Sequence, residues 1–87
     1  MNTITNQRTN TEWTWDMATG IAEGFEKSDN ADMILESWAY IGQSGLYRTL
    51  QGWFGRRLNM YVSYGVLTED FVPVWDEWDG SRRNIFH

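Results

Sequence analysis

The sequence predicts an all-α protein: a small three-helix bundle built on an αα-hairpin, with an extended or short-helical C-terminal segment packed across it. Apolar residues recur at helical spacing in three stretches, and glycines or runs of Ser, Asp and Asn separate these stretches. The chain has 87 residues, which predicts at most one domain, and its many aromatic residues with a single proline argue against full disorder. We assign residues 12–80 to a single helical domain, residues 1–11 to a flexible N-terminus and residues 81–87 to a tail.

The first helix is expected from about Glu12 or Thr14 to Glu26. Its apolar residues at helical spacing are Met17, Ala18, Ile21, Ala22 and Phe25. Gly20 and Gly24 lie within it, and each weakens a helix by about 1 kcal/mol relative to alanine. Because they are four residues apart, they form a small-residue face where another helix can approach closely.

The second helix is expected from about Asn30 to Gln43, after three residues at 28–30 that all favour the N-cap position. The expected buried stripe is Ala31, Ile34, Leu35, Trp38 and Ile41. The same helical periodicity puts Asp32 and Glu36 on the outer face.

The third helix is expected from about Leu46 to Tyr64. Gly45 is the expected left-handed residue that ends the second helix, and Gly65 has the same place after the third. The expected stripe of the third helix is Leu46, Leu50, Trp53, Phe54, Leu58, Tyr61 and Val62. A short loop between the second and third helices makes them an αα-hairpin.

Two tryptophans and two glycines define the expected contact within this hairpin. Trp38 and Trp53 both fall on apolar stripes, so both are expected in the core. Gly52 and Gly55 are three residues apart and should let a neighbouring element pack closely against the third helix. A large side chain at Gly52 should therefore overpack this crossing.

The pattern changes after the third helix. Pro73 is the only proline, and it pushes Val72 towards an extended conformation. We expect a turn or extended segment across the bundle, anchored by Phe71, Val74 and Trp75.

The composition excludes several classes of protein. There is no cysteine, which excludes disulfides, thiolate metal sites and a thiol nucleophile and fits a reducing compartment. No apolar run approaches the roughly 18 residues that span a bilayer, and residues 1–11 lack the basic and apolar blocks of a signal peptide. We therefore expect a soluble, intracellular protein with no membrane partner.

No catalytic constellation is evident. The only histidine, His87, is the last residue, so a Ser/His/Asp or Cys/His arrangement and a His/Cys zinc site are not expected. Asp76 and Asp79 are three residues apart, but carboxylates at this spacing are usually solvated. We expect no enzyme activity, no cofactor and no metal.

Charge is unevenly distributed along the chain. The net charge is −5, yet residues 37–68 contain three arginines and no acidic residue. Arg48, Arg56 and Arg57 are the candidates for nucleic-acid binding through the third helix, although overall acidity works against it. The favoured alternative is that these arginines pair with Asp32, Glu36 or the acidic C-terminal residues.

One block resembles a known family. Residues 38–41 read Trp-Ala-Tyr-Ile, Gly45 and Leu46 follow, and residues 50–56 read Leu-Gln-Gly-Trp-Phe-Gly-Arg. This pattern is similar to a block in short proteins encoded by tailed bacteriophages, and the resemblance covers roughly residues 31–69. It implies a phage accessory gene product with a helical fold and brings no reaction with it. The acidic, Trp-rich C-terminus departs from the usual pattern of the family.

The six tryptophans carry the remaining functional signal. A bundle this small does not easily bury six indoles, so one or two of Trp13, Trp15, Trp75 and Trp78 are expected at the surface. Exposed aromatic side chains that are rimmed by charge are typical of a partner surface. The candidate partner-binding residues are Trp75, Asp76, Glu77, Trp78, Asp79, Arg48 and Arg56.

These observations lead us to expect a small phage accessory protein that acts in the host cytoplasm. It would bind a host protein, such as part of a defence or nucleic-acid-processing system, and inhibit or redirect it through an acidic, Trp-rich surface. Two alternatives stay open: a nucleic-acid-binding protein that uses the third helix, and a structural or scaffold component of a phage assembly. The oligomeric state is also open.

Overall fold

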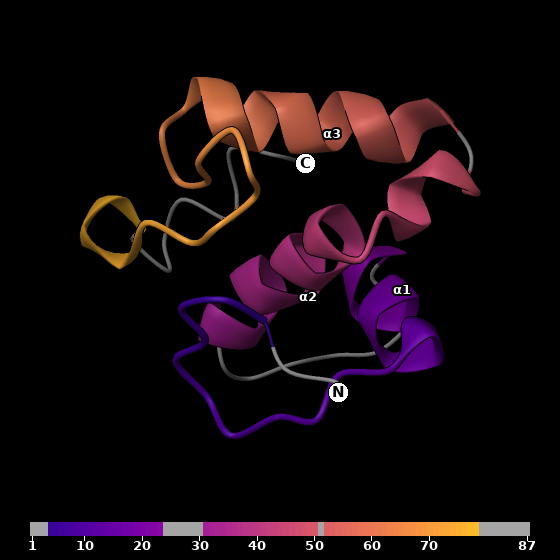
Figure 1. Ribbon diagram of the computed structural model, residues 1–87, viewed down its shortest axis with the longest axis horizontal. Coiled ribbons are helices and arrows are strands. Elements are labelled where there is room, and N and C mark those ends of the chain that lie inside the picture. The colour runs from indigo at the N-terminus through magenta and orange to yellow at the C-terminus, as the bar shows by residue number, and fades with distance from the viewer. Residues whose placement is uncertain (1–3, 24–30, 51, 79–87) are drawn as a thin grey trace.

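The computed structural model describes residues 4–23, 31–50 and 52–78 (Figure 1). The elements in chain order are α1 (Trp15–Glu23), α2 (Ala31–Gln43), the 3-10 turn η1 (Leu46–Arg48), α3 (Gly52–Ser63) and the 3-10 turn η2 (Trp75–Glu77). In Figure 1, α3 runs across the top of the view, α2 crosses beneath it, and α1 lies beside α2. The predicted all-α fold of three helices with a C-terminal segment packed across them is confirmed. The predicted end of the first helix, residues 24–26, and the tail at 81–87 lie outside the described residues.

Helix α2 is the centre of the molecule. Every residue from Leu35 to Gly42 is buried, so this helix is enclosed on all sides and not along one stripe. The expectation that Glu36 lies on the outer face is therefore wrong. The face that it occupies is covered by residues 4–13, which precede α1 and lie against α2.

Residues 4–9 of the predicted flexible arm at 1–11 lie against the rest of the fold, and residues 1–3 lie outside the described residues. Ile4 is buried in the core, and the amide of Thr5 donates to the side-chain oxygen of Gln43 at the end of α2 (2.8 Å). Residues 8 and 9 donate to Glu36 in the middle of the same helix. Hydrogen bonds, and not an apolar stripe, place this polar Asn- and Thr-rich segment against α2.

Helix α3 begins six residues later than predicted. Leu46–Arg48 form the turn η1, and Thr49 donates both its amide and its hydroxyl to the carbonyl of Leu46, each at 2.9 Å. These local hydrogen bonds close a 3-10 turn in place of an α-helical start. The predicted left-handed residues are confirmed, since φ is 76° at Gly45 and 81° at Gly65.

The hairpin core is an aromatic cluster around Trp38, which is 2% exposed. Its ring lies 5.7 Å from Phe54, 5.6 Å from Tyr61 and 6.0 Å from Trp53, measured between centroids. The prediction for Trp38 is thus confirmed. Trp53, however, is only half-buried, because α3 turns Phe54 and Tyr61 towards α2 and leaves Trp53 at the edge of the contact.

The close approach of backbone and side chain occurs at Gly42 and not at Gly52 or Gly55. A Cβ atom on Gly42 would lie 2.4 Å from Cγ of Phe71, whereas on Gly52 its nearest neighbour would be the Arg56 guanidinium at 3.4 Å. The predicted crossing at Gly52 and Gly55 is therefore wrong. The small residue is needed at the end of α2, where the C-terminal segment crosses it.

The C-terminal segment folds back on the bundle as a hairpin-like loop. An isolated antiparallel bridge pairs Leu67 with Pro73, and both residues are buried. Phe71 lies at the tip of this loop with φ of 63°, an uncommon conformation for an aromatic residue. The Gln43 side-chain amide donates to the Phe71 carbonyl (2.9 Å), so the loop is fastened to the end of α2.

Candidate functional site

The expected acidic, Trp-rich surface is only partly present in the C-terminal segment. Trp78 is 7% exposed, which removes it from the surface, and Trp75 is half-buried. Asp76 and Glu77 are exposed on η2. Asp79 lies outside the described residues. The surface of η2 that a partner could contact therefore consists mainly of two carboxylates, because its indole is half-buried.

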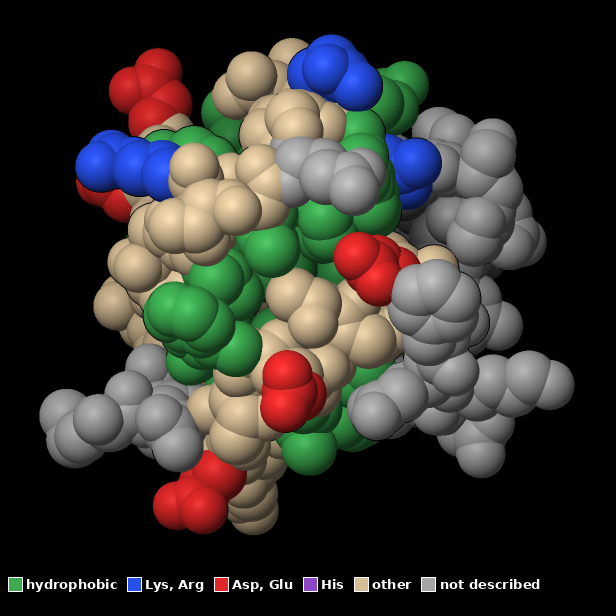
Figure 2. Space-filling model, turned by 90° about the vertical axis from the view of Figure 1, so that its right-hand side faces the viewer, with side chains coloured by type: hydrophobic (Ala, Val, Ile, Leu, Met, Phe, Trp, Pro, Cys, Tyr) green, Lys and Arg blue, Asp and Glu red, His purple; other side chains and the backbone are tan. Residues whose placement is uncertain are grey.

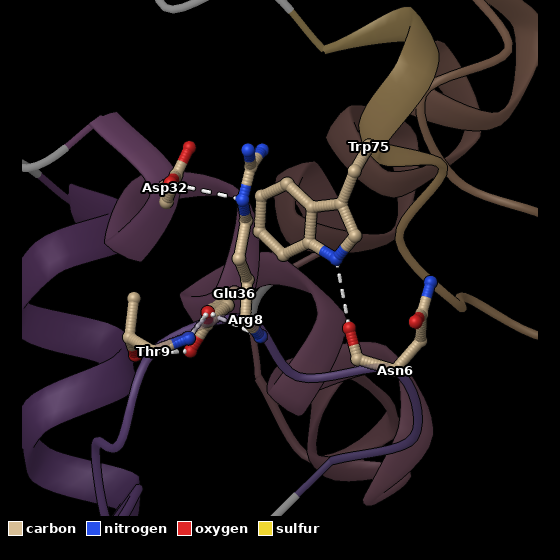
Figure 3. Close-up of polar contacts among 6 residues, drawn as sticks. All are labelled: Asn6, Arg8, Thr9, Asp32, Glu36 and Trp75. Atoms are coloured by element: carbon tan, nitrogen blue, oxygen red, sulfur yellow. Dashed lines mark hydrogen bonds and ion pairs between the residues drawn. The ribbon is translucent and has the colours of Figure 1, made fainter.

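Trp75 is held by the N-terminal segment (Figure 3). Its indole nitrogen donates to the carbonyl oxygen of Asn6 at 2.8 Å, and the Arg8 guanidinium lies over the ring, 5.2 Å from its centroid. The Asn6 side chain donates in turn to the carbonyl of Pro73 at 2.8 Å. Trp75 therefore links the N-terminal and C-terminal segments of the described chain.

Close to these contacts lies a fully buried carboxylate, that of Glu36 (Figure 3). One carboxylate oxygen accepts from the amides of Arg8 (3.0 Å) and Thr9 (2.7 Å). The other accepts from the Thr9 hydroxyl (2.7 Å) and the Trp13 indole (3.1 Å). Four donors on two oxygens satisfy a buried carboxylate, so this arrangement is a structural anchor and presents no reactive group to solvent.

The most exposed tryptophan is Trp15, at the start of α1. Its side chain is 59% exposed, and the nearby acidic residues Glu12 and Asp16 are exposed as well. Thr14 precedes it as the helix cap, with its hydroxyl accepting from the amide of Met17 at 3.2 Å. Residues two apart in an extended segment lie on the same side, so the strand-like alternation of Trp13 and Trp15 does not predict that one is buried and the other exposed. Trp15 is the first residue of α1, so the extended spacing ends there.

The two acidic residues of α2 named as possible partners of the arginines contact the N-terminal segment. Asp32 forms an ion pair with Arg8 at 3.7 Å, and the four donors to Glu36 all come from residues 8–13. Arg48 instead lies over the ring of its neighbour Tyr47, at 5.7 Å from the centroid. Arg56 is exposed on α3, and Arg57 is half-buried beside Tyr61.

A shallow groove lies where α2, η1 and the C-terminal loop meet. Its volume is about 570 Å³. The lining residues are Gly42, Gln43, Ser44, Gly45, Tyr47, Arg48, Glu69, Asp70 and Phe71. Among these described lining residues there is no histidine, cysteine or serine–base pair that would supply a nucleophile. Within residues 4–23, 31–50 and 52–78 there is also no group of three or more His, Cys, Asp or Glu side chains placed to hold a metal ion.

Figure 2 views the side of the molecule that carries α1 and the turn between α2 and α3. Hydrophobic side chains reach the surface there in a band, basic side chains gather in the upper part, and acidic side chains lie around the band. An open surface of this kind is unlike an enclosed ligand pocket.

Comparison with known proteins gives one partial similarity. The chain is 26% identical over 58 residues to ABC transporter A family member 5 of Dictyostelium discoideum. The match covers 67% of this chain but 3% of the length of that protein. No family model and no solved structure matches the chain. Among the helices that the structure describes, none has the length and apolar character to cross a membrane.

Proposed function

We propose that the protein is a small phage accessory protein that binds a host protein and inhibits or redirects it. The phage origin rests on the Leu-Gln-Gly-Trp-Phe-Gly-Arg block at residues 50–56. The binding role rests on Trp15, a tryptophan with 59% of its side chain exposed and acidic neighbours on both sides of it in the sequence.

Packing within the fold does not explain why a tryptophan occupies position 15. The buried residues of α1 are Ala18 and Ile21, and they attach this helix to α2 without it. A tryptophan left mostly in water forfeits the burial that makes the residue stabilising, and tryptophan is the residue most enriched among interface hot spots. The partner surface that fits it is an apolar pocket with a basic rim, which Glu12 and Asp16 complement.

The test is capture of a host protein in stoichiometric amount, followed by titration of the purified pair. Trp15→Ala is expected to weaken binding by about 2–4 kcal/mol, because truncation of a central aromatic anchor typically costs this much. Its unfolding midpoint should match that of the parent. The control is Asn59→Ala, which truncates an exposed side chain on a different helix.

A second variant examines the C-terminal part of the expected surface. Asp76→Asn combined with Glu77→Gln removes the two exposed charges of η2 without changing side-chain size. If this double variant loses the partner and Trp15→Ala keeps it, the contact lies on η2 and not on α1. Absence of any stoichiometric partner from every plausible host would overturn the proposed function.

A further inference from the structure

The outer side of α3 carries a line of four side chains that the fold does not bury completely. At 100° per residue, positions 53, 57, 60 and 64 of a helix fall within an arc of about 60°. The amide of Tyr64 donates to the carbonyl of Met60 at 2.9 Å, so the helical spacing continues to residue 64. The line from Trp53 to Tyr64 spans 11 residues and is therefore about 16 Å long. We call these four residues the α3 stripe.

The α3 stripe reaches the surface along its length. Met60 is 38% exposed and Tyr64 is 50% exposed, and with Trp15 they are the exposed large hydrophobic residues among those described. Trp53 is half-buried, as is Arg57. Arg56 is exposed one position away from the line.

The two half-buried members of the α3 stripe, Trp53 and Arg57, are held in place by contacts within the protein. The Trp53 ring stacks on Phe54 with centroids 4.0 Å apart, and its edge meets Trp38. Arg57 is hydrogen-bonded to Tyr61, a core residue that is 2% exposed. Side chains that are fixed before binding lose less conformational entropy when a partner docks, which favours their use as anchors.

The residue types point to a protein partner. Tryptophan, tyrosine, methionine and arginine are all enriched in the centres of protein interfaces, whereas lysine, aspartate and glutamate are depleted there. Helix α3 contains none of those three depleted residues and two arginines, although the whole chain has a net charge of −5. A merely solvated helix face would instead carry mixed charges. The complementary surface on the partner is therefore acidic.

We propose that the α3 stripe is a docking surface for an acidic amphipathic helix of a protein partner. A line of anchors at positions i, i+4, i+7 and i+11 matches the contact that one helix makes with another packed along it. Apolar side chains of the incoming helix would lie on Trp53, Met60 and Tyr64, and its carboxylates would face Arg56 and Arg57. This surface is on α3, whereas Trp15 is on α1 below it in Figure 1, so the protein has two separate contact regions.

The test is selection from a displayed library of helical peptides that are randomised on one face. Enriched peptides should combine apolar residues at helical spacing with flanking Asp and Glu. Met60→Glu should weaken their binding at least about tenfold by placing a like charge in the contact. Binding should also weaken as salt is raised. Trp15→Ala is the matched control and should bind the same peptides as tightly as the parent does.

Three outcomes would overturn the inference. The library yields no binder, the enriched peptides bind Met60→Glu as tightly as the parent, or a short single-stranded oligothymidine binds the stripe and displaces the peptides. The last result would make α3 a nucleic-acid surface, with the aromatic rings as stacking platforms. Because the peptides are expected to contact the α3 stripe and not Trp15, the outcome of this test is separate from that of the proposed function.

Discussion

At the scale of single residues, Glu36 is the side chain whose structural role is least expected from its residue type. It is fully buried, and the four donors to its oxygens are two backbone amides, a hydroxyl and an indole. Hydrogen bonds to a charged group contribute more to stability than neutral ones, and a buried donor that loses its acceptor is costly. Glu36 thereby converts a polar N-terminal segment into a fixed part of the fold.

Glu36→Gln should lower the free energy of unfolding by about 3 kcal/mol. Glutamine has nearly the same shape, but its amide nitrogen is a donor and would face donors of residues 8–13. Urea denaturation followed by circular dichroism measures the change. The matched control is Asp32→Asn on the same helix, whose ion pair with Arg8 is at the surface and should contribute no more than about 1 kcal/mol. Equal losses in the two variants would contradict the anchoring role.

Tyr61 gives the folded protein a dependence on alkaline pH. Burial raises the pKa of Tyr61 to about 12 from an ordinary value of 10.0, and the charge and hydrogen bond of Arg57 offset part of that rise. The fold therefore favours the neutral phenol. This contribution to stability is fully present below pH 10 and is lost as the pH rises through about 12.

Two units of pKa correspond to about 3 kcal/mol, which is the stability that the parent should lose through Tyr61 between pH 9 and about pH 12. Tyr61→Phe removes this group and keeps the ring against Trp38. Urea unfolding of both proteins across this range isolates the effect, because all other titrating groups are shared. Parallel pH curves for the two proteins would show that the phenol of Tyr61 ionises freely in the folded state.

At the scale of elements, the contact between α2 and the C-terminal loop depends on Gly42. A Cβ atom there would lie within 3 Å of three atoms of the Phe71 side chain. Phe71 is fastened by Gln43 and has an uncommon backbone conformation, so the loop has little freedom to move aside. Gly42 is thus the position where a helix-favouring residue should be harmful.

Gly42→Ala should lower the free energy of unfolding by about 2 kcal/mol through overpacking, although alanine is the better helix former. Gly52→Ala should instead be neutral or stabilise by up to about 1 kcal/mol, because its Cβ would meet only the Arg56 side chain at 3.4 Å. Thermal and urea unfolding of the two variants give the comparison. If Gly42→Ala is the more stable of the pair, the crossing of Phe71 over α2 is not tight.

The register of α3 shows why helical spacing was informative but incomplete. The expected stripe contained Trp53, Phe54, Leu58 and Tyr61, and all of these residues do lie on α3. Three of them are buried, whereas Trp53 is at the edge. The expected stripe of seven residues covers more than one face of the helix, and only the neighbouring helix selects which of these residues become core.

At the scale of the whole molecule, the two ends of the described chain are joined across α2. Residues 4–9 contact Gln43, Glu36, Pro73 and Trp75, which belong to the central helix and the C-terminal segment. A domain of this size has a total stability of roughly 4–13 kcal/mol, so these contacts are a substantial share of it. The N-terminal segment is consequently expected to unfold together with the rest.

Removal of residues 1–9 should therefore lower the free energy of unfolding by about 3 kcal/mol or more, since Glu36 loses three of its four donors and Trp75 its partner Asn6. Limited proteolysis should then cleave the C-terminal loop at residues 66–74 faster than in the parent. The comparison protein is the full chain with Asn6→Gly, which removes the side-chain hydrogen bond to Pro73 at a position where φ is 61°, and it should show a smaller effect. Unchanged stability after truncation would mean that the segment is the flexible arm that its composition predicts.

The sequence by itself determined the class of fold, the second helix almost to the residue, and the two left-handed glycines that end helices. These are local properties: apolar spacing, capping residues and backbone conformations that glycine adopts most easily. The exclusion of thiol and disulfide chemistry is also a property of composition alone, since the chain has no cysteine.

Only the tertiary structure decided where the polar N-terminal segment lies, which tryptophans are exposed and which glycine is crowded. Glu36 is buried because residues 4–13 cover it, Trp75 is shielded because Arg8 lies over it, and Trp15 is exposed because Trp13 takes the inward position. Each outcome depends on a contact between residues far apart in the chain, or on the direction in which the chain enters a helix. Periodicity within one segment contains no information about either, and the candidate surfaces on α1 and α3 became visible only when the segments were assembled.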